Sequence, residues 1–357
     1  MKVRKIVVTV VLTLLVLGLV FSSALADEPV DDDGSSVGEG QVFFPNPVAY
    51  LNDYTLTDQD DADYEALQQA YVEVVLTNLD GSGYLHGDWA YIFKSVGPLA
   101  FEPDNVFIYD RHDDRFEQVM GYYWVTEAQK YIQSLGFGTG LYDPINMEPQ
   151  DIRINQLGQD NSYSWDKFDM LRFGKGGVDD AEDAEVILHE YGHAMMDSQS
   201  DPFGNWGLSH ESGALGEGFS DYWAVTVSDV IAPTDADPDC VADWDAISYA
   251  AGPIYCLRRV DLDLYYPEDM TTSIHHDGQI WSRALWDIRQ EVGHVVADTL
   301  ILEAIFDFAP DTSFEDAAQI TVDTAQRLYG NKVAKVVREA FTERGILEGS
   351  GKNPHGN

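Results

Sequence analysis

Two histidines four residues apart, His189 and His193, are the feature that most constrains this chain of 357 residues. They enclose the run His-Glu-Tyr-Gly-His, and residues four apart lie on one face of an α-helix, so both imidazoles can reach a single metal ion. Glu190 follows the first histidine directly and lies near enough to accept a proton from a water on that ion. Two histidines on an ordinary surface helix would need no third ligand. The pattern therefore predicts a metal-binding helix and a further ligand elsewhere in the chain.

Glu217 is the candidate for that third ligand. It lies in the run Gly-Ala-Leu-Gly-Glu-Gly-Phe-Ser-Asp at residues 213–221, where Leu215 and Phe219 indicate a buried helix. A buried carboxylate without a partner is costly, so coordination explains Glu217 better than a solvated position does. Asp221 follows one helical turn later and can orient a metal-bound histidine through its second ring nitrogen. Two histidines and one glutamate leave a fourth tetrahedral position open, which is typical of a catalytic zinc site.

These motifs resemble the thermolysin-like zinc metallopeptidases (gluzincins), and most closely the fungalysin family. The resemblance covers residues 122–347 and rests on three runs: 189–193, Gly-Glu-Gly-Phe-Ser-Asp at 216–221, and His-His-Asp-Gly-Gln-Ile-Trp-Ser-Arg-Ala-Leu-Trp at 275–286. It implies an α+β, thermolysin-like bilobed metallopeptidase, with a β-rich N-terminal part, a mainly helical C-terminal lobe and the zinc helix between them. It also implies hydrolysis of internal peptide bonds in proteins or peptides, with a bulky apolar residue after the cut.

The resemblance assigns further residues to the substrate. A histidine three residues before a glycine donates a hydrogen bond to the tetrahedral intermediate in fungalysin-like enzymes, which corresponds to His275, with His276 as its adjacent rival. An asparagine followed by a small residue edges the cleft in the family, and Asn161 and Ser162 correspond to it. The family arginine that binds a substrate carbonyl corresponds to Arg258.

Two positions depart from thermolysin itself. Leu208 stands where a tyrosine assists the oxyanion, and Met270 stands where an aspartate orients the catalytic histidine. One lost donor costs about 10²–10³ in rate, so the enzyme is expected to be slower or to use another donor. The alternative is a catalytically inactive zinc-binding exoprotein that acts as a binding or adhesion module, although the intact Glu190 argues against it. A metzincin is disfavoured because Met196 and Gln199 occupy the places of its glycine and third histidine.

The first residues predict export. Lys2, Arg4 and Lys5 precede an apolar stretch at residues 6–21, and Ala-Leu-Ala at 24–26 fits signal peptidase cleavage. The alternative of an uncleaved anchor is disfavoured, because the stretch is shorter than the ~20 residues of a membrane span. A signal peptide at residues 1–26 and a secreted, extracellular product are therefore expected.

The chain is strongly acidic, with a formal net charge of −41. Such a surface repels nucleic acids and anionic membranes, which excludes both as partners after signal removal. The acidity can serve high-salt solvation, solubility or calcium binding, and Asp-rich runs at residues 58–63 and 179–183 are candidate calcium ligands. A calcium-loaded structural protein would explain these runs but not the zinc motifs. We expect a monomer.

Two cysteines, Cys240 and Cys256, are present. An even count in an exported chain predicts one disulfide, and two free thiols are the alternative. Neither has a histidine or cysteine at metal-binding spacing.

The expected organisation runs from strands to helices. An acidic flexible linker at 27–40 precedes a β-rich region at 41–115, a catalytic region at 116–348 and a disordered tail at 349–357. A hairpin is expected from 73–78 and 87–93 around the turn Asp-Gly-Ser-Gly at 80–83, and further strands at 151–157 and 163–173. Helices are expected at 116–135, 180–196, 216–230, 279–291, 294–308, 314–328 and 333–344.

Overall fold

The structure is a computed structural model that describes residues 35–200, 207–249 and 255–348. The expected signal peptide, the first part of the linker and the C-terminal tail lie outside the described residues. Residues 36–40, expected within the linker, instead belong to strand β1 (Ser36–Phe43). They pair with β2 (Tyr71–Leu79), with Gly40 opposite Val74 and Phe43 opposite Tyr71. Local composition suggested flexibility there, but pairing with a distant strand decides the conformation.

The first seven strands form two sheets that differ in the directions of their strands. The first has the order β2-β1-β4, with β4 (Val106–Phe107) parallel to β1. The second has the order β3-β5-β7-β6. Its strands β3 (Ala90–Ser95), β5 (Gln150–Leu157) and β7 (Met170–Gly174) are parallel, and β6 (Tyr163–Trp165) is the antiparallel edge strand. The strand expected at 163–173 is therefore two strands, separated by a 3-10 turn, η2 (Asp166–Phe168).

The expected hairpin is wrong, because β2 and β3 belong to different sheets. Its two arms contact each other through an isolated bridge between Leu79 and Gly87, and through the Asp88 amide, which donates to the Asn78 Oδ1 at 2.6 Å. The turn is present as a tight loop, in which the Asp80 amide donates to the His86 carbonyl at 2.9 Å. After this loop the chain enters the second sheet, where Ala90 lies opposite Gln150. The turn residues predicted the reversal correctly, but the partner of the outgoing strand is set by distant residues.

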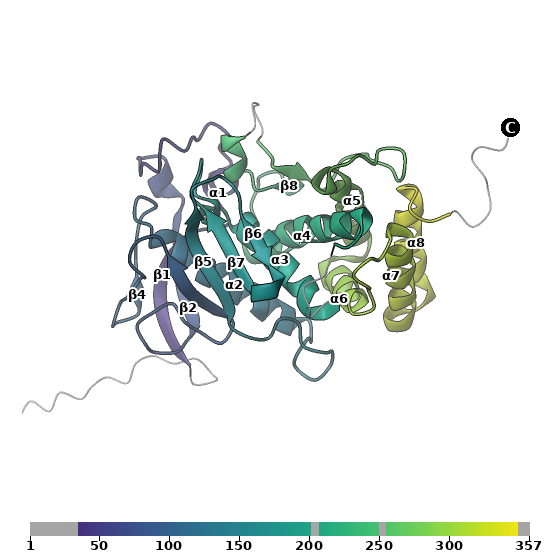
Figure 1. Cartoon of the computed structure of the whole chain (residues 1–357), viewed down its shortest axis with the longest axis horizontal. Coiled ribbons are helices and arrows are strands. Elements are labelled where there is room, and N and C mark those ends of the chain that lie inside the picture. The colour runs from purple at the N-terminus through teal and green to yellow at the C-terminus, as the bar shows by residue number, and fades with distance from the viewer. Residues whose placement is uncertain (1–34, 201–206, 250–254, 349–357) are drawn as a thin grey trace, which may run out of the picture.

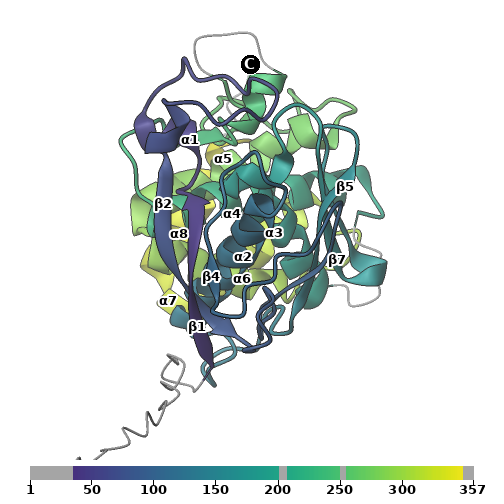
Figure 2. The same cartoon turned by 90° about the vertical axis from the view of Figure 1, so that its left-hand side faces the viewer.

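Helix α2 (Phe116–Ser134) explains why two sheets are needed. It is buried on nearly every side, polar residues such as Glu117 and Gln129 included, so it has to be covered from more than one direction. The first sheet covers one side, where Trp124 donates to the Phe43 carbonyl, and the second covers the other, where Ile152 and Ile154 pack beside Gly121. Figure 2 shows α2 between the two sheets, with β1 and β2 toward the viewer and β5 and β7 to one side.

The second half of the chain is mainly helical, which confirms the expected α+β class. In Figure 1 the helices α4 to α8 lie on the opposite side of the molecule from the first sheet, with α3 between. The expected helix at 180 begins later, because 180–182 is a 3-10 turn, η3 (Asp180–Glu182). The helix at 279 begins earlier, at Ile274, where the Ser273 side chain caps it. The helices are α3 (Ala184–Ser200), α4 (His210–Ile231), α5 (Ile274–Val292), α6 (His294–Ile305), α7 (Phe314–Tyr329) and α8 (Asn331–Glu343).

Short elements complete the chain. Helix α1 (Pro47–Leu51) and the 3-10 turn η1 (Leu67–Gln69) follow β1, and η4 (Asp245–Ser248) follows β8 (Cys240–Val241), which pairs with β9 (Arg258–Arg259). Across the described ranges, no helix has both the length and the apolar character needed to cross a bilayer.

Candidate active site

Three helices that pack closely bring the predicted metal ligands together. Gly192 of α3 faces α4 so tightly that a Cβ there would lie 3.0 Å from the Ser220 Cα. Gly218 of α4 faces α5 in the same way, since a Cβ there would lie 2.3 Å from the Gly278 carbonyl oxygen. Small residues at these positions let the backbones approach. Glu217, between the two contacts, is therefore held against both α3 and α5.

The predicted ligand atoms have the spacing of a tetrahedral site. The His189 Nε2 lies 3.2 Å from the His193 Nε2 and 3.4 Å from the Glu217 Oε2, and the His193 Nε2 lies 3.7 Å from the Glu217 Oε1. Ligands bound to zinc at 2.0–2.1 Å in tetrahedral geometry are separated by about 3.4 Å. The Glu217 Oε2 is buried and accepts no hydrogen bond from a described residue. Coordination would satisfy this oxygen, so the three residues fit a zinc ion.

Asp221 holds the first histidine in position. Its fully buried carboxylate accepts from the His189 Nδ1 at 2.9 Å and from Arg258 through Nε at 2.7 Å and Nη2 at 2.8 Å. A proton on Nδ1 leaves the lone pair of Nε2 free to face Glu217 and His193. Burial alone would raise the pKa of Asp221, but the charge of Arg258 and the bond from His189 lower it, so the carboxylate stays ionised.

Burial and neighbouring charges give Glu217 and Glu190 different protonation states. Burial would raise the pKa of Glu217, but the neighbouring imidazoles of His189 and His193 hold it well below its usual range. Burial dominates for Glu190 and raises its pKa to about 7. Glu217 is thus ionised, while Glu190 can both take and release a proton near neutral pH.

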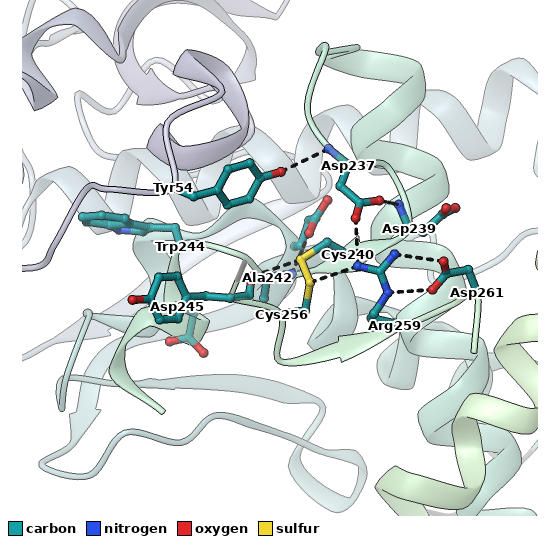
Figure 3. Close-up of a disulfide and its surroundings, with 12 residues drawn as sticks. Tyr54, Asp237, Asp239, Cys240, Ala242, Trp244, Asp245, Cys256, Arg259 and Asp261 are labelled. Atoms are coloured by element: carbon teal, nitrogen blue, oxygen red, sulfur yellow. Dashed lines mark hydrogen bonds and ion pairs between the residues drawn. A yellow bond between two sulfur atoms is a disulfide. The ribbon is translucent and has the colours of Figure 1, made fainter. Parts of the chain in front are cut away.

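A disulfide links the two sides of the hairpin that contains Arg258. Cys240 and Cys256 are bonded, with an S–S distance of 2.02 Å, so the alternative of two free thiols does not hold. Directly beside this disulfide, strands β8 and β9 pair, with Val241 opposite Arg258. In Figure 3, Arg259 lies between Asp237 and Asp261 next to the disulfide, and it contacts them at 2.8 and 2.7 Å. The hairpin is therefore tied on both sides of the arginine that contacts Asp221.

His275, rather than His276, faces the predicted ligands. The His275 Nε2 lies 3.5 Å from the Glu217 Oε2, and its side chain is 55% exposed, so it is open to a substrate. His276 instead contacts the Asp277 carboxylate through Nδ1 at 3.0 Å. Of the two adjacent histidines, His275 is the one that the structure brings to the site.

One pair near the cleft was missed in the sequence. The His210 Nε2 lies 2.7 Å from the Asp277 Oδ2, and Asp277 is fully buried and also accepts from the Thr271 amide at 2.8 Å. His210 lines the same cavity as the exposed Leu208 and as Glu217. It belongs to no motif, and only its contact in space with Asp277 reveals it.

Asn161 and Ser162 lie at the edge of the cleft, immediately before β6. Asn161 is exposed, and β6 is an edge strand, so an extended peptide could pair beside it. The Ser162 hydroxyl is instead directed at the Asp180 carboxylate, to which it donates a hydrogen bond.

Two cavities meet at Glu190. The larger, about 640 Å³, extends along His193, Leu208 and His210. The smaller, about 230 Å³, extends along Arg258. Asn161, Ser162, His189, Glu190 and His275 line both, so a chain bound across them would pass the predicted ligands.

The two acidic runs expected to bind calcium are divided among several partners. In the first, Asp58 contacts the buried Arg111 at 2.5 Å. In the second, Asp183 accepts from backbone amides, including that of Trp244 at 3.1 Å. Glu182 of the second run contacts Arg111 at 2.9 Å. Asp179 and Asp180 converge with distant residues in two groups: Asp114, Glu117 and Asp179, and Asp160, Asp180 and Asp245.

Comparisons with known proteins point to one family. Residues 205–346 match the family model described as the alpha-helical domain of thermolysin metallopeptidase. The chain is 24% identical over 212 residues to a gelatinase of Enterococcus faecalis, 23% over 203 residues to an extracellular metalloproteinase MEP of Leptosphaeria maculans, and 25% over 250 residues to an extracellular metalloproteinase 4 of Arthroderma otae. These matches cover 52%, 49% and 61% of this chain but 38%, 32% and 36% of the relatives, so the chain spans about a third of their length.

The fold has a match among solved structures. The precursor of protealysin, a metalloproteinase from Serratia proteamaculans, superposes with a TM-score of 0.57 at 15% identity. The match covers 73% of this chain and 90% of that one. At this identity the likeness shows the fold, and the chemistry has to be argued from the residues.

Proposed function

Because this chain is a relative of the thermolysin-like metallopeptidases, we propose that it is a secreted, zinc-dependent endopeptidase. The observation that carries the proposal is the set of candidate ligand atoms from His189, His193 and Glu217, which lie 3.2–3.7 Å apart. The buried Glu217 Oε2 among them accepts no hydrogen bond from a described residue. Glu190 lies beside them and lines both cavities of the cleft.

The donor set favours zinc over a harder ion. Two imidazoles and one carboxylate suit zinc, whereas calcium prefers six or more oxygen ligands. A zinc ion held there supplies Lewis-acid chemistry, which polarises a carbonyl and makes water more acidic. We propose calcium as a second ion, bound by acidic residues elsewhere in the chain.

Glu190 acts as the general base and acid. It takes a proton from the attacking water and passes it to the nitrogen of the leaving amine, which needs a group that exchanges a proton near neutral pH. A pKa of about 7 supports this role.

Three residues bind and orient the substrate. His275 donates a hydrogen bond to the oxygen on which negative charge develops. Arg258, fixed by Asp221, binds a carbonyl of the substrate through its remaining N–H groups. Asn161 holds the peptide backbone beside the edge strand β6.

The relatives support the proposed location and the class of substrate. Their printed names describe extracellular metalloproteinases and a gelatinase, which fits a secreted enzyme acting on proteins. We propose that the catalytic region spans residues 116–348, that the chain acts as a monomer, and that nucleic acids and membranes are not its partners. The competing hypothesis is an inactive zinc-binding protein, because Leu208 and Met270 replace two residues that assist catalysis in thermolysin.

Casein cleavage by the purified protein tests the proposal. We expect cleavage that a chelator abolishes and zinc restores, and that the Glu190→Gln variant lacks while it retains one bound zinc in elemental analysis. Glu339→Gln, an exposed substitution of the same kind on α8, is the matched control and should cleave as the unaltered protein does. One bound zinc without cleavage, at salt from low to molar, would overturn the proposed activity in favour of the inactive binding protein.

A further inference from the structure

The smaller cavity of the cleft is lined by an unusual concentration of carboxylates. Asp160, Asp180 and Asp245 come from three separate segments: the loop before β6, the turn η3 and the turn η4. One oxygen of each lies within 4.8 Å of the others. All three share the cavity with Glu190 and Arg258, so they lie beside the proposed reaction centre.

These carboxylates are not neutralised by a neighbouring cation. Asp180 and Asp245 are only 2% and 3% exposed, and the Oδ1 of each is buried without a hydrogen-bond partner among the described residues. The other contacts come from neutral hydroxyls, since Ser162 donates to Asp180 and Tyr249 donates to Asp160 at 2.5 Å. Burial raises the pKa of Asp180 to about 7, as expected where negative charge lacks compensation.

Arg258 supplies only a small part of that compensation, since burial still raises the pKa of Asp245 well above its usual range. It is the only lysine or arginine among the described residues that line this cavity, and its Nε and Nη2 are directed at Asp221. A buried carboxylate group of this kind would be stabilised by a positive charge brought in from outside.

The remaining lining favours a long side chain over a bare ion. Val186, Val241 and Leu257 line the same cavity as the carboxylates, within about 230 Å³. Lysine and arginine bury their methylene stems on apolar surface and place the charged end at polar groups. A hydrated metal ion would gain nothing from the apolar residues.

We propose that this cavity binds the lysine or arginine side chain of a substrate residue that flanks the scissile bond, and that the enzyme therefore cleaves beside basic residues. The inference rests on the proposed peptidase function. It departs from the bulky apolar preference that the family resemblance implies, because Asp160, Asp180 and Asp245 line the cavity beside Glu190 and Arg258.

Matched peptides test the inference. Digestion of a peptide library identifies the position at which residues are selected, and quenched peptides then carry lysine, norleucine or glutamate at that position. Norleucine has the same stem as lysine without the ammonium group, so the ratio of kcat/KM for lysine over norleucine isolates the charge. We expect this ratio to be tenfold or more, since a hydrogen bond to a charged group changes affinity by about that factor.

Variants locate the selectivity in the cavity. Asp245→Asn and Asp160→Asn should each lower the lysine-to-norleucine ratio several-fold, while Asp323→Asn, an exposed substitution on α7, should leave it unchanged. The ratio compares two substrates of one preparation, so it does not depend on the fraction that folds. A ratio near one in the unaltered protein, or a high ratio that both pocket variants retain, would overturn the inference.

A binding measurement separates this inference from the proposed activity. Calorimetry of the zinc-loaded Glu190→Gln variant should give tighter binding of the lysine peptide than of the norleucine peptide, even if no preparation cleaves. Equal binding of the two peptides, together with a bound calcium ion that Asp245→Asn loses, would overturn the inference and assign the carboxylates to a metal. Cleavage that prefers norleucine would overturn the inference and leave the peptidase function intact.

Discussion

Replacement of Asp221 by asparagine should weaken both the metal site and the fold. Asp221 is fully buried and accepts three hydrogen bonds, from the His189 Nδ1 at 2.9 Å and from Arg258 at 2.7 and 2.8 Å. Asparagine keeps the size but removes the charge, and its amide nitrogen would face one of the donors. The change therefore leaves Arg258 buried beside a neutral group.

The magnitude follows from these contacts. Hydrogen bonds to charged groups contribute about 1.5–3 kcal/mol each, and breaking a buried ion pair costs about 3–5 kcal/mol in total because the contacts are not additive. We expect the free energy of unfolding of the metal-free protein to fall by about 3 kcal/mol. Loss of the acceptor that orients a metal-bound histidine typically costs 10- to 100-fold in metal affinity.

Two assays measure the two effects. Urea unfolding with a chelator present gives the free energy of unfolding, and competition with a chromophoric chelator gives the zinc affinity. Asp323→Asn, on the exposed face of α7, is the control for the chemical change itself. Zinc affinity within twofold of the unaltered protein, with unfolding changed by less than about 0.5 kcal/mol, would refute the role assigned to Asp221.

Three further predictions concern the fold. Gly218→Ala should lower the melting temperature by several degrees, because overpacking costs about 1–3 kcal/mol and the added Cβ would lie 2.3 Å from the Gly278 carbonyl; an unchanged melting temperature would contradict the helix contact. Reduction of the bond between Cys240 and Cys256, which are 16 residues apart, should destabilise the chain by about 2–3 kcal/mol in urea unfolding, and equal midpoints with and without reductant would argue against it. Burial raises the pKa of Asp180 from 3.8 to about 7, so its contribution to stability is fully present below pH ~4 and is lost as pH rises through about 7. Between pH 4 and pH 8, the free energy of unfolding should therefore fall by about 1–3 kcal/mol more in the unaltered protein than in Asp180→Asn. Parallel pH profiles of the two proteins would show that this carboxyl is not responsible.

The proposed metal ligands could be predicted from the sequence because their geometry is largely local. Helical periodicity alone places His189 and His193 on one face, and the structure has both on α3. Glu217 was inferred from its place on a buried helix, whereas His275 needed the family resemblance, since nothing in their spacing says that α4 and α5 pack against α3. The contact depends on glycines whose role is visible only when the helices are side by side.

The errors concern partners that are distant in the chain. The hairpin failed because β2 and β3 pair with β1 and β5, respectively, and a turn signal carries no information about such pairing. Residues 36–40 were assigned to a linker on composition, although β2 holds them in a sheet. The carboxylates at Asp160 and Asp245 were missed for the same reason, since each is an ordinary acidic loop residue until the fold joins them.

The contact between Gly218 and Gly278 also bears on how the cleft can open. Glu217 and His275 lie beside this contact, on two helices whose backbones touch and cannot slide without collision. The helical wall of the cleft should therefore behave as a rigid body on the timescale of turnover. We expect the motions that open the cleft for a polypeptide to occur only in the opposite wall. There, Asn161 precedes the three-residue edge strand β6. Hydrogen exchange would then be fast in that strand and slow in the first turns of α5.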